Sequence, residues 1–177
     1  MTDVQHPQSK HRLATALACL AFLSVAATVP AAAPETPAPA SAQRQQEVRE
    51  RGAAVMPFSL DRTLHTFAKT DTGGVQRVRA SNAAADQVAM IRSHLHSIAQ
   101  AFSARDFDAP AHIHGADMPG MAEMKKAKPD ELTVDYHELD DGAELDYVGR
   151  SPAIIAAIHR WFDAQLADHG SDAVPGA

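Results

Sequence analysis

The sequence is poor in cysteine: its 177 residues contain one, Cys19, which lies in an apolar stretch near the N-terminus. The apolar run before Cys19 is too short for a lipoprotein acceptor site, so we expect this residue to be removed with a signal segment. A mature chain without cysteine has no disulfide, no thiolate metal ligand and no cysteine nucleophile. Such an exported domain must be large enough to be held together by its hydrophobic core.

Blocks of like charge and common catalytic motifs are also missing. The 16 basic and 22 acidic side chains give a net charge of −6 and are mixed along the chain. This distribution argues against nucleic acid or an anionic membrane surface as a partner. The sequence has no G-x-S-x-G or H-E-x-x-H hydrolase signature. It has no C-x-x-C-H motif either, so any haem would be bound non-covalently.

The first 33 residues have the features of a secretory signal peptide. Basic residues at Lys10 and Arg12 precede an apolar run, Leu13–Val29, and three small residues, Ala31–Ala33, follow it. This pattern predicts cleavage near Ala33 and a periplasmic or secreted protein, with no membrane insertion after cleavage. A retained N-terminal anchor is the alternative.

The remaining chain divides into three parts by composition. Residues 34–54 are rich in Pro, Ala and Gln and predict a disordered linker that buries no core. Residues 55–170 are long enough for one domain. Residues 171–177 predict a disordered tail.

Periodicity within residues 55–170 predicts an α+β fold. Two hairpins are expected, over 56–80 and 132–148, because short β-favouring runs flank the turn residues Asp71–Gly74 and Asp140–Gly142. Apolar residues at helical spacing predict two long helices, one through 88–102 and one from Ser151 to His169. A short helix is expected from Asp117 to about Lys128. The resulting fold is an antiparallel sheet of about four strands packed by these helices.

Histidine and methionine are concentrated between Met90 and Met124. This stretch contains four of the ten histidines, which are His94, His96, His112 and His114, and four of the six methionines, which are Met90, Met118, Met121 and Met124. Imidazole and thioether are neutral ligands that suit copper and other late transition metals. At about 100° per residue, His94 lies at the edge of the apolar stripe and His96 points toward solvent.

Histidines outside this stretch differ in their expected environments. Strand alternation places His65 on the same face as Phe67, so His65 is predicted to face the core. His137 is predicted on a solvated strand face. His159 lies at the edge of the last helix's apolar face, and His169 is predicted to interact with the C-terminal end of that helix's dipole.

About residues 56–172 resemble a known family of proteins. The chain resembles a family of small exported bacterial proteins that are often labelled aspartate carbamoyltransferases. The matching positions are Phe58, Thr63, His65, Phe67, Gly73, Gly74, Ile91, Arg92, His94, Leu95, Ile98, Ala99, Phe102, Phe107, Pro110, His114, Pro119, Gly120, Met124, Ala157, Ile158, His159, Asp168 and His169. That label does not fit the chemistry, because the chain has no Ser-Thr-Arg-Thr phosphate loop and is too short for two α/β domains. The resemblance implies a shortlist of histidines and includes Met124, but omits His96, His112, His137 and Met118.

These observations lead to one leading hypothesis and several alternatives. We expect an exported metal-binding protein for copper handling or storage, with His65, His94, His114 and Met124 as ligands. Zinc is the alternative ion, and His112, Met118, Met121 and His159 are possible additional ligands. The other hypotheses are an envelope protein with a structural histidine network, a non-covalent haem binder, or a small metal-dependent hydrolase. Catalytic residues and a protein partner are not predicted.

Overall fold

The structure, a computed structural model, describes residues 1–3 and 37–176. Residues 37–176 form one α+β domain. The predicted signal peptide and the first residues of the predicted linker fall on residues 4–36, outside the described part. Along the chain the principal elements are α1 (Ala42–Val55), β1 (Thr63–Thr70), β2 (Gly73–Ala80), α2 (Ala85–Ser103), α3 (Asp108–His114), α4 (Met121–Lys126), β3 (Leu132–Leu139), β4 (Gly142–Gly149), α5 (Pro152–His169) and β5 (Ala173–Pro175). No helix within the described ranges is long and apolar enough to cross a membrane.

The sheet contains the two predicted hairpins and one further strand. Its order is β3-β4-β2-β1-β5, with β1–β2, β2–β4 and β3–β4 antiparallel. The fifth strand, β5, pairs in parallel with β1, and His65 lies opposite Ala173. The sheet is therefore mixed rather than purely antiparallel. The prediction of a disordered tail after residue 170 differs from the structure here, because backbone pairing with β1 orders residues 173–175.

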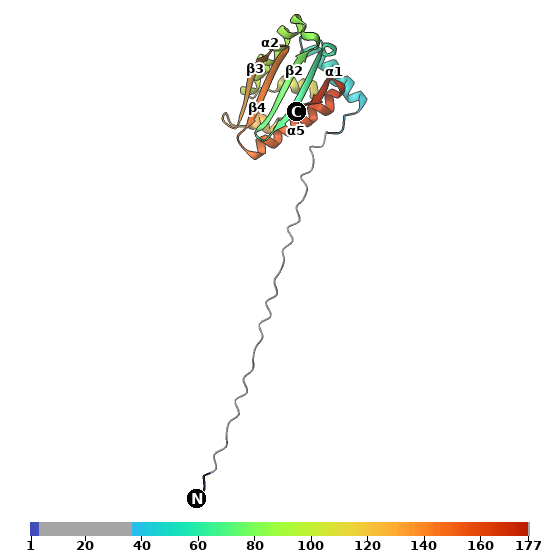
Figure 1. The fold of residues 1–177 in the computed structure, drawn as a ribbon. Coiled ribbons are helices and arrows are strands. Elements are labelled where there is room, and N and C mark those ends of the chain that lie inside the picture. The colour runs from blue at the N-terminus through green and yellow to red at the C-terminus, as the bar shows by residue number, and fades with distance from the viewer. Residues whose placement is uncertain (4–36, 177) are drawn as a thin grey trace. The chain divides into compact units, whose positions relative to one another are not determined.

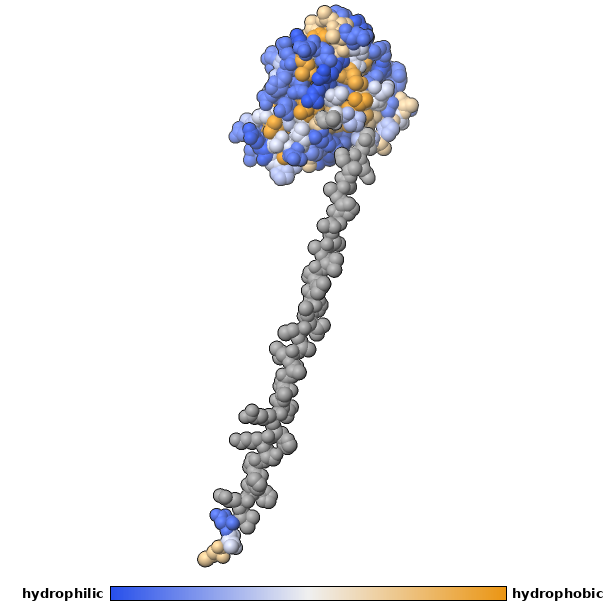
Figure 2. Space-filling model, viewed as in Figure 1, coloured by the Kyte–Doolittle hydropathy of each residue, from blue (hydrophilic) through white to orange (hydrophobic). Residues whose placement is uncertain are grey.

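Helices cover one face of the sheet and leave the other face open (Figure 1). Helix α2 packs on β3 and β4, while α5 packs on β1, β2 and β4. Gly74 on β2 permits the close approach of α5, because a Cβ atom there would collide with the ring of Phe162. The open face carries mixed polar and apolar side chains (Figure 2). This arrangement is usual for an antiparallel sheet with one solvated face.

Helix α1 occupies a segment that composition predicted to be a disordered linker. Residues 42–55 contain no proline and are mostly Ala, Gln, Glu and Arg, which favour helix. Ser41 caps the helix by accepting a hydrogen bond from the Arg44 backbone N–H. Val48 and Gly52 are its buried residues. Arginines fix α1 to the rest of the domain, since Arg51 donates to the Ile113 carbonyl at 2.8 Å.

Helix α3 forms the segment around Pro110, between α2 and α4. Residues Asp108–His114 form two short helical turns with Pro110 near the start, where a missing backbone N–H costs little. In a helix, residues two apart point in different directions, so His112 and His114 separate. His112 is exposed, whereas His114 is buried with 3% of its surface accessible.

Arg105 joins the end of α2 to the loop before β3. Its guanidinium donates to the backbone carbonyls of Ala127 at 3.0 Å, Lys128 at 2.8 Å and Leu132 at 2.9 Å. We expect Arg105→Ala to lower the free energy of unfolding by about 2 kcal/mol, because the carbonyls of Ala127 and Leu132, in partly buried bonds, lose charge-assisted donors. Arg105→Lys is expected to recover less than half, because an ammonium cannot reproduce the planar fork. Urea titration measures both, and full stability in the alanine variant would contradict this role.

Candidate functional site

Four histidines from separate elements line one cavity of about 70 Å³. His65 comes from β1, His94 from α2, His114 from the end of α3 and His169 from the end of α5. The cavity walls also include apolar side chains of α1, α2 and α5. His65, His114 and His169 are each less than 10% exposed, so this is an interior cluster of imidazoles.

His65 is neutral and has a free nitrogen. Burial lowers its pKa to about 4, although a hydrogen bond with the backbone of Asp172 opposes this shift. Nδ1 of His65 is buried without a hydrogen-bond partner. In the neutral tautomer with its proton on Nε2, Nδ1 carries an unused lone pair.

His114 is oriented by a chain of charged groups. Its Nδ1 lies 2.8 Å from Oδ2 of Asp168. The Asp168 carboxylate also accepts two hydrogen bonds from Arg44 on α1, one at Oδ1 at 3.0 Å and one at Oδ2 at 2.7 Å. Burial raises the pKa of Asp168, but hydrogen bonds from His114 and Arg44 outweigh it and lower the pKa to about 2. An ionised carboxylate only accepts, so Nδ1–H of His114 is the donor. The Nε2 lone pair remains for another partner, as in carboxylate–histidine–metal arrangements.

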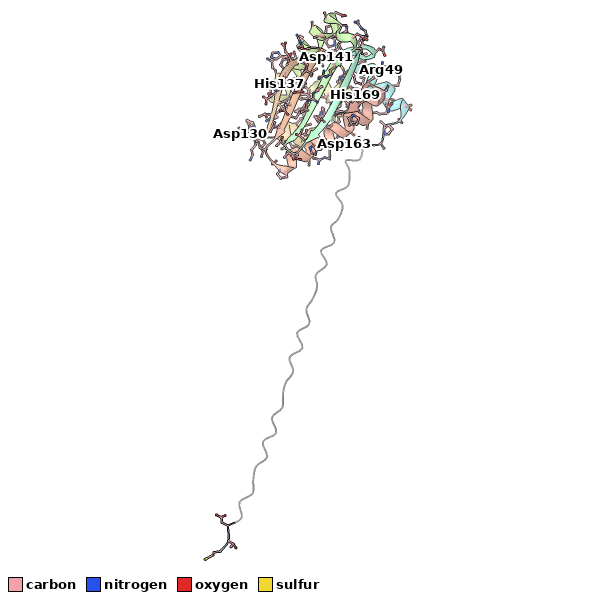
Figure 3. All side chains as sticks on the ribbon, viewed as in Figure 1. Arg49, Asp130, His137, Asp141, Asp163 and His169 are labelled. Carbon is pink, nitrogen blue, oxygen red and sulfur yellow. The ribbon has the colours of Figure 1, made fainter. Side chains whose placement is uncertain are left out.

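His169 lies between the two preceding histidines. Its ring centroid is 5.4 Å from that of His65 and 5.0 Å from that of His114. Burial lowers the pKa of His169 well below its ordinary value, with further lowering by His65 and His114. His169 lies on the same side of the domain as Arg49 of α1, and His137 lies toward the other edge of the sheet (Figure 3).

His94 stands apart from the other three rings. The ring of Phe58 contacts both His94 and His65, with centroid distances of 5.6 and 6.1 Å. Burial lowers the pKa of His94, and the side chain is only partly buried. It therefore lies at the edge of the cavity rather than within the cluster.

The methionines predicted as ligands lie elsewhere. Met118, Met121 and Met124 are all buried in the hydrophobic core, and none of the three lines the histidine cavity. Met124 on α4 is fully buried there. The structure thus groups three of the four predicted ligands around the cavity and separates Met124 from them.

The remaining histidines have other surroundings. His96, His112 and His137 are exposed, as the helical and strand periodicities predicted for His96 and His137. His159 contacts the β1–β2 turn, where its Nε2 lies 3.0 Å from the Thr70 carbonyl and 2.9 Å from the Gly73 carbonyl. That geometry ties α5 to the hairpin and gives His159 a structural role.

Three groups at this site, His169, Asp168 and Arg44, were not identified by sequence periodicity. His169 was assigned to the helix dipole, although Asp168 and His169 both matched the family pattern, which was the available signal. Arg44 lay in the predicted linker, and only its three-dimensional contact with Asp168 shows its role.

As the side chains stand, no group of three or more His, Cys, Asp or Glu residues within residues 1–3 and 37–176 is placed to hold one metal ion. A metal bound by the three inner rings would therefore require their side chains to move. Comparisons with protein-family models, curated proteins and solved structures find no match to this chain.

Proposed function

We propose that this protein binds a late first-row transition metal with His65, His114 and His169. The observation that carries this proposal is the three buried imidazoles at centroid distances of 5.0 and 5.4 Å, from three separate elements. Two imidazoles on one tetrahedral ion, with nitrogen–metal distances of about 2.0–2.1 Å, have centroids about 5 Å apart. Since no three of these groups hold an ion as they stand, metal binding would include a change in the orientation of these side chains.

The protonation states also favour a metal. A ligand imidazole must be neutral, and burial lowers the pKa of His65 and His169. His65 offers Nδ1, which has no hydrogen-bond partner, and His114 offers Nε2, because its Nδ1 is hydrogen-bonded to Asp168. His94, which lines the same cavity and contacts Phe58, is the further candidate.

Copper is the first candidate ion and zinc the second. Thioether ligation by Met118, Met121 or Met124 no longer supports copper, because these three methionines are in the core. The argument for copper is instead that, among divalent first-row metal ions, Cu(II) binds most tightly to nitrogen ligands. Imidazole also suits zinc. One small site per chain favours metal handling over bulk storage. We retain export to the periplasm or exterior as part of this proposal, on the strength of residues 10–33.

The cavity does not favour haem. Its volume is about 70 Å³, so a porphyrin would fit only if the core opened widely. The structural-network alternative keeps its force, because His114 and His159 do make hydrogen bonds within the protein. A measurement of the number of metal ions bound per chain distinguishes a structural histidine network from a metal site.

The test is metal binding by the purified protein, followed by elemental analysis and by fluorescence of Trp161, the single tryptophan. We expect one equivalent of Cu(II) to quench Trp161, which lines the same cavity. His114→Ala is expected to weaken binding about 100-fold, because a ligand is lost. His112→Ala, two residues away on α3 and exposed, is the matched control and is expected to bind normally.

Several results would overturn this proposal. Binding of neither copper nor zinc by the wild-type protein would do so. Equal loss of affinity in the His112 and His114 variants would also contradict the assignment. The imidazoles would then be a structural network around the cavity.

A further inference from the structure

Helix α1 borders the buried imidazoles at several points along its length. Its last residue, Val55, lines the histidine cavity. Arg44 lines a second hollow, which His114 and Asp168 also line. A third hollow borders His169, and the residues of α1 that line it are Ala42, Gln45, Gln46, Val48 and Arg49. The helix thus covers the part of the domain that contains the histidine cluster.

Two arginines of α1 hold the end of α3, which carries His114. Arg44 donates to the backbone carbonyl of His114 and to the Asp168 carboxylate, which is itself hydrogen-bonded to the His114 ring. Arg51 donates to the backbone carbonyl of Ile113, one residue earlier. Contacts with α1 therefore fix both the backbone and the ring of His114.

A third arginine of α1 holds the turn that follows His169. Arg49 pairs with Asp172 in η3 (Gly170–Asp172), which leads from the end of α5 to β5. The same guanidinium pairs with Asp61 in η1 (Leu60–Arg62). Docking of α1 therefore draws together segments that are far apart in the sequence and that flank the cluster.

Apolar packing contributes little to the attachment of α1. Val48 and Gly52 are the buried residues of its 14, and Val48 lies outside the main hydrophobic core. The side chains of Arg44 and Arg49 are 33% and 34% exposed, and that of Asp61 is 83% exposed. Ion pairs with this much exposure are weak and are screened by salt. A segment held in this way can open while the rest of the domain stays folded.

The position of a hinge is set by the chain after α1. Met56 leaves the helical conformation, with φ −80° and ψ 128°, and Pro57 follows it. Phe58 and Leu60 are then buried in the main core. A change of backbone conformation at Met56 would therefore move α1 without moving these two core residues.

We propose that α1 is a lid over the histidine cluster and that it opens at residues 56–57 while the sheet, α2 and α5 stay folded. Opening separates Arg44 from Asp168 and gives solvent access to His65, His114 and His169. It is also the step that lets a metal ion reach or leave the cluster. This role in metal exchange rests on the proposed function, whereas the lid itself does not.

The test measures how fast diethyl pyrocarbonate modifies each histidine of the metal-free protein, with mass spectrometry of peptides to locate the products. The reagent acylates neutral imidazoles that solvent can reach. We expect His65, His114 and His169 to react much more slowly than the exposed His112 and His137. Lid opening is expected to set the rate at the three buried rings.

Two variants loosen the lid. Val48→Ala is expected to raise the rate at the three buried rings about tenfold, because α1 loses part of its apolar contact. Arg49→Ala is expected to raise it about threefold, because α1 loses two ion pairs. Arg62→Ala removes an exposed ion pair with Asp86 outside α1, and this matched control is expected to leave the rate unchanged.

Val134→Ala distinguishes the lid from unfolding of the whole domain. Val134 is also a buried valine, but it lies on β3 at the opposite edge of the sheet from β5. The substitution is expected to lower the stability of the domain and to leave the rates at His65, His114 and His169 unchanged.

Two results would overturn the lid. One is an equal acceleration of the three buried rings in Val48→Ala and Val134→Ala, since the cluster would then be exposed through unfolding of the domain. The other is an unchanged rate in Val48→Ala. Because the protein is free of metal throughout, a failure to bind copper or zinc would contradict the proposed function alone.

Discussion

Asp168→Ala is expected to lower the free energy of unfolding by about 3 kcal/mol, one of the two largest effects that we predict. Removing one partner of a buried ion pair leaves the other charge uncompensated, which costs about 3–5 kcal/mol. Asp168 is 11% exposed in its side chain and serves both Arg44 and His114. We expect the lower end of the range, because Arg44 is 33% exposed and water can solvate it in part.

The substitution is also expected to weaken metal binding 10- to 100-fold, because His114 loses the carboxylate that orients its ring. Asp168→Asn keeps the shape and an acceptor oxygen, so its loss of stability is expected to be smaller. The pair Arg160–Glu123 provides a matched exposed control, with side chains about half exposed. Glu123→Ala is expected to change stability by less than about 0.5 kcal/mol.

Urea unfolding measures the stability of these variants, and metal titration measures their affinity. If Asp168→Ala were as stable as the Glu123→Ala control, the Arg44–Asp168–His114 chain would have no structural role. If stability fell and metal affinity did not, Asp168 would support the fold without orienting His114 as a ligand.

The fold could be predicted where the signal was local. Turn residues between alternating strands located both hairpins, and Ser151-Pro152 together with a 3.6-residue apolar period located α5. Helix α1 and strand β5 could not be found this way. Arginine contacts with distant carbonyls and carboxylates hold α1, and β5 needs only three residues paired with β1. Neither the arginine contacts nor so short a strand pairing produces a periodic pattern in the sequence.

The site could be predicted in part for the same reason. Strand alternation placed His65 inward, and helical phase separated His94 from His96. The role of Met124 could not be predicted, because a methionine that fills the core and a methionine that binds a soft metal show the same spacing in the sequence. His169 joins His65 only because η3 (Gly170–Asp172) returns the chain to β1, which requires knowledge of the tertiary fold.

Acidification of the metal-free protein from pH 7 is expected to lower its stability by about 2 kcal/mol at pH 5 and about 3 kcal/mol at pH 4 from His65 alone. The pKa of His65 falls from 6.5 to about 4 on folding. Between these values the unfolded chain binds more protons than the folded protein, so stability falls as the pH falls. His94 and His169 act in the same direction, because burial lowers their pKa values too.

Asp168 contributes at lower pH. Its pKa is about 2 in the folded protein, against an ordinary value of 3.8, so its stabilising contribution is present above pH 4 and is lost below that pH. A loss of stability between pH 6.5 and 4 therefore belongs to the histidines and precedes any loss of the Arg44–Asp168 pair.

Urea titrations between pH 7.5 and 4.5, with a chelator present, measure this dependence. His65→Leu is expected to flatten it by removing one buried proton acceptor, whereas His137→Ala, at an exposed position, is expected to leave it unchanged. A wild-type stability that stays constant from pH 7 to 5 would mean that the buried imidazoles gain protons as readily as free ones. Such rings would not be held as neutral donors of a lone pair, and the electrostatic argument for a metal at His65 would fail with them.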